Sequence, residues 1–148
     1  MVTKMRHNEV VRLQIPGETR YIGIARQAVD AIGEHLDLSA DARMAVKIAV
    51  GEACNNAVQH TPSGGERDGS LLIACRVEPE ALEIDVTNPG NGFHPHEPAN
   101  MPAGETLAEH GRGMALMEIM MDSVEYLSED GNTTVRMRKR RPALAVAH

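Results

Sequence analysis

Hydrophobic and polar positions change their period several times along the chain, and each change predicts a different element. Residues 10–15 alternate between apolar and polar side chains, which predicts a short strand. Over residues 18–36 the apolar side chains recur at helical spacing, which predicts an amphipathic helix. Ser39 is a good N-cap residue, and we expect it to begin a second helix that runs to His60.

The second half of the chain predicts two β-hairpins separated by a long loop and a helix. The expected strands cover residues 70–77, 82–87, 124–127 and 133–138. Residues 88–110 are rich in glycine, proline and histidine, and a connection of that length usually marks function or a lid. A helix rich in methionine and leucine is expected over residues 113–122.

The expected order of elements is therefore β-α-α-β-β-loop-α-β-β. Because most of these strands join antiparallel neighbours, we expect an α+β fold: a two-layer α/β sandwich with helices on one face of a mixed, mostly antiparallel sheet. Polar residues alternate onto the other face, which indicates that it is partly solvated or covered by a partner. The 148 residues fit one domain, expected over residues 8–140, with a disordered tail over 141–148.

Composition narrows the classes of function. The net charge of −6 and the scarcity of aromatic residues argue against binding to nucleic acid or to an anionic membrane. The basic residues Arg136, Arg138 and 139–141 are expected to form a solvated strand end. Cys54 and Cys75 lie in apolar stretches, so we expect buried thiols. With neither a signal peptide nor an apolar run of membrane length, the cytoplasm is the expected location.

The most informative polar residues lie on the second expected helix. At about 100° per residue, Glu52, Asn56 and His60 fall along one ridge. Asparagine is a poor helix former, so the consecutive Asn55 and Asn56 indicate that something holds them there. Glu52 could accept a proton from an attacking hydroxyl or water, and the amide oxygen of Asn56 could be a Mg²⁺ ligand. The alternative is the ordinary polar face of an amphipathic helix.

Two glycine-rich turns flank the long loop. Residues 88–93 follow a strand directly, and their two glycines would let the backbone approach a flat ligand closely. Residues 111–114 precede the expected third helix, where free N–H groups and Arg112 would suit phosphate oxygens. An ordinary surface turn explains either segment equally well by itself. A metal site at His94 and His96 would need further ligands that the sequence does not clearly supply.

Taken together, these motifs resemble the histidine-kinase-like ATPase superfamily, whose Bergerat ATP-binding fold is shared by gyrase, Hsp90, MutL and sensor kinases. Within it, the chain is similar in particular to the anti-sigma-factor serine-protein kinases of bacterial stress and sporulation switches. The resemblance covers roughly residues 8 to 140. The matching residues are Glu52, Asn56, Ala57 and His60; Asn88, Gly90, Gly92 and Phe93; Gly111, Arg112, Gly113 and Met114; and Gly131, Thr133, Thr134 and Val135.

The resemblance implies a partner-switching regulator that uses ATP and Mg²⁺ and is often a homodimer. Such a protein binds a sigma factor and, in an alternative complex, phosphorylates a serine of a STAS-domain anti-anti-sigma protein. Glu52 would be the catalytic base, Asn56 the Mg²⁺ ligand and residues 94–110 the ATP lid. The implied nucleotide contacts are Asn56, Asn88, Gly90, Gly92, Gly111, Arg112, Gly113, Met114, Thr133 and Thr134.

Asn88 departs from the family pattern, which usually has an aspartate that accepts a hydrogen bond from the adenine amino group. Asparagine keeps an acceptor oxygen but loses the charge, and charge-assisted hydrogen bonds are roughly twice as strong as neutral ones. Weaker or altered nucleotide binding is therefore expected. Two hypotheses stay open: a serine-protein kinase, favoured by the pair of Glu52 and Asn56, and a non-catalytic binding module with weak nucleotide affinity, favoured by Asn88. A detached sensor-kinase catalytic domain is a third.

Overall fold

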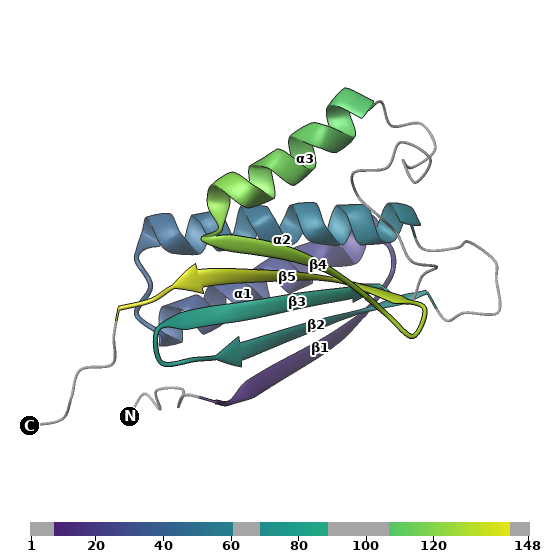
Figure 1. Ribbon diagram of the computed structural model, residues 1–148. Coiled ribbons are helices and arrows are strands. Elements are labelled where there is room, and N and C mark those ends of the chain that lie inside the picture. The colour runs from purple at the N-terminus through teal and green to yellow at the C-terminus, as the bar shows by residue number, and fades with distance from the viewer. Residues whose placement is uncertain (1–7, 61–68, 89–106, 143–148) are drawn as a thin grey trace, which may run out of the picture.

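The computed structural model describes residues 8–60, 69–88 and 107–142. Figure 1 shows a sheet with helices packed on one side of it. In chain order the elements are β1 (Val10–Pro16), the 3₁₀ turn η1 (Thr19–Tyr21), α1 (Ile22–His35), α2 (Ala40–His60), β2 (Ser70–Val77), β3 (Ala81–Asn88), α3 (Leu107–Met120), β4 (Ser123–Glu129) and β5 (Asn132–Arg140).

The strands form a single five-stranded sheet in the order β1-β2-β3-β5-β4. All four neighbouring pairs are antiparallel, so the expected α+β sandwich is confirmed, while the sheet is antiparallel in these pairings rather than mixed. In the middle strand, Ile84 stands opposite Cys75 of β2 and Met137 of β5. Helix α2 contacts α1, α3 and the central strand β3, and it therefore lies at the centre of the helical layer.

The covered face of the sheet is aliphatic because every second residue of a strand points to the same side. Buried residues of β2 and β3 on this face are Leu71, Ile73, Cys75, Val77, Leu82, Ile84 and Val86. Helix α3 and the residue after it pack into the same core through Met114, Met117 and Met121. The expected buried thiols are confirmed, since Cys54 and Cys75 are free and burial raises the pKa of each to about 12.

The end of α1 and the start of α2 follow local sequence signals. The N–H of Leu38 donates to the carbonyl of Gly33 over 3.0 Å, and Asp37 has φ 59°, as in a helix end closed by one left-handed residue. The hydroxyl of Ser39 then accepts the N–H of Ala42 at 3.0 Å, which confirms the expected N-cap. None of the described helices is long and apolar enough to cross a membrane.

The third helix differs most from the sequence-based expectation. It starts at Leu107 rather than near residue 113, so that Gly111 and Gly113 lie inside a helix. Glycine costs about 1 kcal/mol per residue in a helix, but buried contacts such as that of Met117 outweigh such a local preference. The expected turn at Gly90 and Gly92, the residues Phe93, His94 and His96, most of the lid, and tail residues 143–148 lie outside the described residues.

The face of the sheet away from the helices carries charged side chains that are paired across strands. Arg136 donates through Nε and Nη2 to the two carboxylate oxygens of Asp85, at 2.9 Å each, and its Nε lies 3.0 Å from Oε1 of Glu83. Arg76 lies 2.7 Å from the same Glu83 oxygen. The basic run is therefore not simply a solvated strand end, because antiparallel pairing brings the guanidinium of Arg136 beside two carboxylates.

Candidate functional site

Helix α2 carries the two polar residues that the sequence singled out. Glu52 is half-buried, while Asn56, one turn later, is only 7% exposed. Their neighbours Ala53, Cys54 and Ala57 are buried in the core, and this packing stabilises a helix that the two asparagines would weaken. The side chain of His60 lies outside the described set.

A hollow of about 20 Å³ lies where α2 meets the ends of three strands, and we call it the inner hollow. Its walls are mostly apolar, with a few polar groups converging on it. It is lined by Ala53, Asn56, Ala57, Val86, Asn88, Tyr126, Thr133 and Val135. Asn88 and Thr133 stand opposite each other in the register of β3 and β5, and they are only 5% and 4% exposed. An apolar wall with a few polar groups is the lining found in ligand sites, but about 20 Å³ is the space of roughly one water molecule.

The expected pair Thr133 and Thr134 is divided between the two faces of the sheet. Thr133 lines the inner hollow. The hydroxyl of Thr134 instead lies 2.8 Å from the hydroxyl of Thr87, with which it shares a hydrogen bond. The two threonines point to opposite sides because side chains alternate along a strand.

Sequence reasoning missed Tyr126 of β4, which forms part of the wall of the inner hollow. Burial raises the pKa of its phenol to about 12, and the negative charge of Glu118 adds to this effect. A single tyrosine in a short strand carries no signal of its own. The only indication in the sequence was that aromatic residues are scarce, so that each of the few aromatic side chains is a candidate for a particular role.

Glu52 also lines a second depression, of about 370 Å³, which we call the surface hollow. It is lined by Arg26, Met44, Lys47, Ile48 and Glu52. Gly51 makes this arrangement possible, because a Cβ at that position would stand 2.7 Å from Nε of Arg26. Glu52 therefore faces the surface hollow while Asn56, on the next turn, reaches the inner one.

The Gly-Arg-Gly motif meets Glu52 at the contact between α2 and α3. A Cβ at Gly113 would stand 2.9 Å from Oε2 of Glu52, whereas no heavy atom lies within 4 Å of the corresponding position at Gly111. Arg112 is exposed and Met114 is buried in the core. The predicted helix N-terminus before residue 113 was wrong, because α3 runs through both glycines. Binding phosphate on free N–H groups here would require the first turns of α3 to open.

The polar lining of the inner hollow consists of the amides of Asn56 and Asn88, the hydroxyl of Thr133 and the phenol of Tyr126. Buried amide and hydroxyl groups supply both donors and acceptors on an apolar wall. The described residues contain no group of three or more His, Cys, Asp or Glu side chains that could hold a metal. A Mg²⁺ ion would therefore depend on the oxygen of Asn56 together with phosphate and water oxygens, a donor set that this hard cation prefers.

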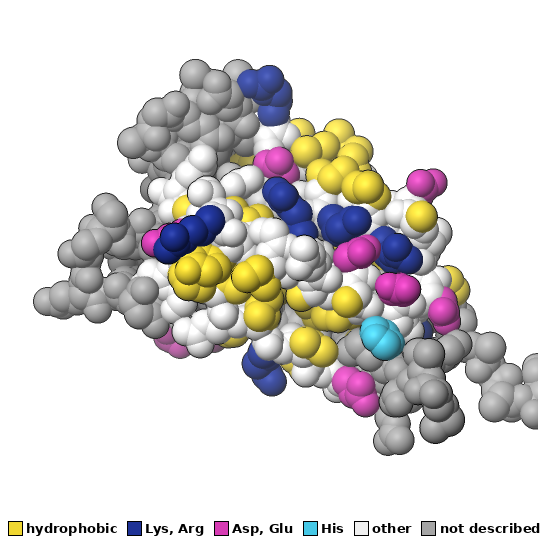
Figure 2. Space-filling view, turned by 180° about the vertical axis from the view of Figure 1, so that it is seen from behind, with side chains coloured by type: hydrophobic (Ala, Val, Ile, Leu, Met, Phe, Trp, Pro, Cys, Tyr) yellow, Lys and Arg dark blue, Asp and Glu magenta, His cyan; other side chains and the backbone are white. Residues whose placement is uncertain are grey.

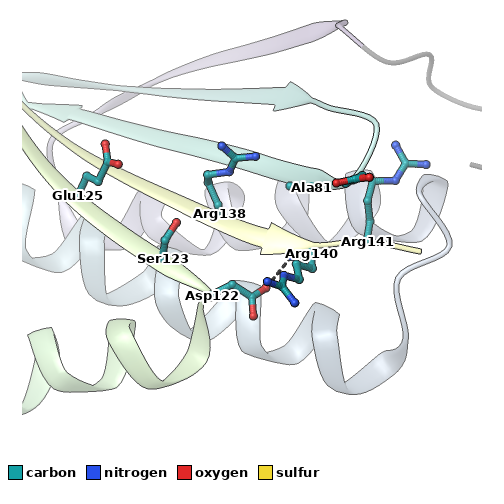
Figure 3. Close-up of a pocket in the computed structure, with 8 residues that line it drawn as sticks. Ala81, Asp122, Ser123, Glu125, Arg138, Arg140 and Arg141 are labelled. Carbon is teal, nitrogen blue, oxygen red and sulfur yellow. Dashed lines mark hydrogen bonds between the residues drawn. The ribbon is translucent and has the colours of Figure 1, made fainter. Parts of the chain in front are cut away.

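A third hollow, of about 590 Å³, lies at the other end of β3 and β5 and contains none of the expected site residues. Figure 3 shows Ser123 and Glu125 on β4 beside Arg138 and Arg140 on β5. The backbone N–H of Arg140 donates to the carboxylate of Asp122 at 2.6 Å. This hollow is lined by acids as well as arginines, and it lies a strand's length from Asn88, so it is not a continuation of the inner hollow.

Comparison with known proteins identifies the family. The family profile of the histidine kinase-like ATPase domain matches residues 15–139. The serine-protein kinase RsbW of Bacillus velezensis is 33% identical, over 88% of this chain and 85% of the relative. RsbW of Bacillus subtilis is 31% identical, over 91% of this chain and 88% of the relative.

A crystal structure of the RsbU and RsbW domains of a Mycobacterium tuberculosis protein is similar in fold, with a TM-score of 0.65 and 16% identity. The similarity covers 94% of this chain but 35% of that longer one, and it supports the fold alone. The family profile and the RsbW relatives are the evidence for the family. The chain belongs to the histidine kinase-like ATPase family and, within it, to the group of the RsbW serine-protein kinases.

Proposed function

We propose that this protein is a cytoplasmic anti-sigma factor and ATP-dependent serine-protein kinase. Its substrate is a serine of a STAS-domain anti-anti-sigma protein, and its alternative partner is a sigma factor. Residues 8–140 form the ATP-binding domain. The observation that carries the proposal is the position of Glu52, which lines the surface hollow one helical turn from Asn56 in the inner hollow.

The chemistry follows from that position. The serine oxygen of the substrate attacks the terminal phosphorus of ATP, an O–P bond forms, and the bond to the leaving ADP oxygen breaks. Glu52 orients the hydroxyl and accepts its proton. A base that lines an open surface hollow can reach a hydroxyl that a second protein presents.

The nucleotide is held by groups of α2, β3 and β5. Asn88, Thr133, Gly90 and Gly92 are assigned to the base, and the amide oxygen of Asn56 would hold Mg²⁺, which would supply neutralisation of phosphate charge. Further phosphate contacts would come from the segment Gly111–Met114 if the start of α3 opens. Thr134 does not join them, because its hydroxyl lies on the other face of the sheet beside that of Thr87. The buried positions of Asn56, Asn88 and Thr133 support this assignment.

The surface hollow is the docking site for the protein substrate. Its apolar members Met44 and Ile48 lie beside the cations Arg26 and Lys47. Met44 is 52% exposed, and together with Ile48 it forms the apolar part of the surface hollow. Figure 2 shows hydrophobic side chains exposed between basic and acidic ones on the side opposite to that of Figure 1. Such a surface suits a partner that presents acidic and apolar groups around its serine.

The direct test incubates the protein with Mg-ATP and a STAS-domain partner and searches for phosphoserine by mass spectrometry. The kinase proposal expects one modified serine on the partner. Stable binding of the partner without any transfer would contradict it and would support a binding module instead.

Met44→Asp is expected to weaken docking of the STAS partner at least about tenfold, because it places a charge in the apolar part of the surface hollow. ATP affinity should stay within about twofold, since Met44 does not line the inner hollow. The measurements are partner binding by calorimetry and nucleotide binding by fluorescence. Exposed Ile119 of α3, outside this hollow, provides the matched control Ile119→Asp. If both variants bound the partner equally well, the surface hollow would not be the docking site.

We further propose that two copies associate through the face of the sheet away from the helices. This face carries the paired charges of Arg76, Glu83 and Arg136, together with Leu72, which is 39% exposed. Leu72→Lys is expected to turn a dimer into a monomer in light scattering, because a second copy would bury that side chain. A wild-type protein that stays monomeric at every concentration would contradict the dimer.

The alternative function is a non-catalytic module that sequesters a protein partner. Two observations favour it: Asn88 provides a neutral amide at the base site, and α3 runs through Gly111 and Gly113. In that case the partner would bind with the same affinity whether or not Mg-ATP is present.

A further inference from the structure

The carboxylate of Glu52 meets α3 at Gly113, where α2 and α3 pack together (Figure 1). A Cβ at Gly113 would stand 2.9 Å from Oε2 and 4.0 Å from Cδ of Glu52. Apart from chain neighbours and the backbone of α3 itself, no other atom of the described residues lies within 4 Å of that position. The missing side chain of Gly113 therefore makes room for this carboxylate and for no other group of α2.

The contact also distinguishes the two oxygens of the carboxylate. Oε2 lies against Gly113, whereas Oε1 is more than 4 Å from the position of the missing Cβ. Oε1 is thus turned away from α3, and it is the oxygen that an incoming hydroxyl can reach. Because Glu52 is half-buried and one of its oxygens rests on a helix, its carboxylate has fewer orientations than one in open solvent.

Gly111, two residues earlier on the same helix, has no such contact. It is exposed, and a Cβ there would meet no atom within 4 Å. Both glycines weaken the helix relative to alanine. Packing gives a reason for glycine at position 113 but not at position 111, and the reason is the carboxylate of Glu52.

An alanine at position 113 would displace the carboxylate rather than the helix. Oε2 would have to retreat by roughly 0.5 to 1 Å to reach ordinary contact distance. It is the far end of a flexible side chain, so the retreat costs little stability. A general base, however, must stay within hydrogen-bond reach of its proton, and a misplacement of about 1 Å can cost about 100-fold in rate.

We propose that Gly113 is a positioning residue for phosphoryl transfer, because its lack of a side chain lets α3 hold the Glu52 carboxylate with Oε1 directed to the substrate hydroxyl. The inference rests on the proposed function, since it takes Glu52 as the base. It gives the Gly-Arg-Gly segment a task at the base in addition to the proposed phosphate contacts. The two tasks are compatible if α3 opens only as far as Arg112, since Gly113 then stays in the helix.

The test compares Gly113→Ala with Gly111→Ala in the full chain, as single-turnover phosphorylation of a STAS-domain partner at saturating Mg-ATP. Both variants remove a helical glycine from the same motif, so they share any effect on helix stability or on phosphate contacts. Only Gly113→Ala meets Glu52. It is expected to transfer phosphate about 30-fold more slowly than Gly111→Ala. Its midpoint of thermal unfolding should be no lower than that of wild type, because alanine favours a helix.

Glu52→Asp supplies the second arm of the experiment. Aspartate is one methylene shorter, so its carboxylate does not reach the added methyl group at position 113. Gly113→Ala should therefore slow the Glu52→Asp variant by less than about threefold, although it slows the wild-type protein strongly. Equal slowing in both backgrounds would show that the effect does not pass through the carboxylate.

Two further outcomes would overturn the inference while leaving the proposed function standing. One is transfer at equal rates by Gly113→Ala and Gly111→Ala. The other is an unfolding midpoint of Gly113→Ala far below that of Gly111→Ala, or failure to fold, because the glycine would then serve the packing of the two helices. Absence of transfer by the wild-type protein would instead contradict the proposed function itself.

Discussion

Glu52→Gln is expected to lower serine phosphorylation by about 10³-fold, because it removes the proton acceptor while keeping the shape of the side chain. The change leaves Asn56, Asn88 and Thr133 in place, and these three line the inner hollow, which Glu52 does not. ATP affinity should therefore stay within about threefold of the wild-type value. Transfer is measured as the single-turnover rate with excess enzyme, and nucleotide affinity by calorimetry.

The control for this experiment is Glu34→Gln, which makes the same change on the exposed surface of α1. It should transfer phosphate at the wild-type rate. Transfer by Glu52→Gln within about tenfold of wild type would show that another group accepts the proton. The geometry makes Glu52 the expected base because its carboxylate is held between Gly113 of α3 and the surface hollow.

Arg136→Met is expected to lower the free energy of unfolding by about 3 kcal/mol, since it removes the bidentate partner of the half-buried Asp85 and leaves the buried Glu83 with Arg76 alone. Glu83 is 8% exposed and Asp85 is half-buried, and Arg136 contacts both. Methionine keeps most of the packing volume of arginine, so the measured loss of stability reflects the removal of the positive charge. Chemical denaturation should be carried out at several protein concentrations, because a dimer would add its own stability.

The cost of Arg136→Met should depend on pH in a defined direction. Burial raises the pKa of Glu83, the hydrogen bond with Glu78 adds to this, and Arg136 opposes it. Without Arg136 the folded-state pKa of Glu83 rises further above the ordinary value of 4.5, so the folded state binds the proton more tightly than the unfolded state. Stability is then lost as pH rises between those two pKa values, and the deficit of the variant should shrink on acidification.

Arg138→Met is the matched control, because Arg138 also bridges to a carboxylate, Glu78, over 2.7 Å, but its side chain is 44% exposed. An exposed pair of this kind contributes about 1 kcal/mol or less. Equal destabilisation by Arg136→Met and Arg138→Met would contradict the view that burial of Glu83 decides the effect.

Local sequence signals predicted much of the fold. The N-cap at Ser39 and the hairpin of β2 and β3 appear where capping chemistry and alternation placed them. The start of α3 was not predictable in this way, because Gly111 and Gly113 are ordinarily read as helix breakers. The packing of Met114 and Met117 in the core outweighs the cost of placing the two glycines in a helix.

The candidate site was predictable only in part. The spacing of Glu52 and Asn56 was visible because a helix has a fixed period, but the sequence did not show that the two residues face different hollows. Alternation along a strand separates Thr133 from Thr134, but the sequence did not tell which of them faces the helices. The sequence did not predict Tyr126 as a site residue, because it lies near residues of α2 only in the folded molecule.

The sequence by itself determined the period of each element, the polar ridge of α2 and the family to which the chain belongs. Tertiary structure alone decided that Asn88, Thr133 and Tyr126 line one hollow with Asn56, and that Glu52 faces a second one. The physical reason is the distance along the sequence over which each effect acts. Periodicity and capping act between residues a few positions apart, whereas the hollows form where side chains distant in the sequence exclude water together.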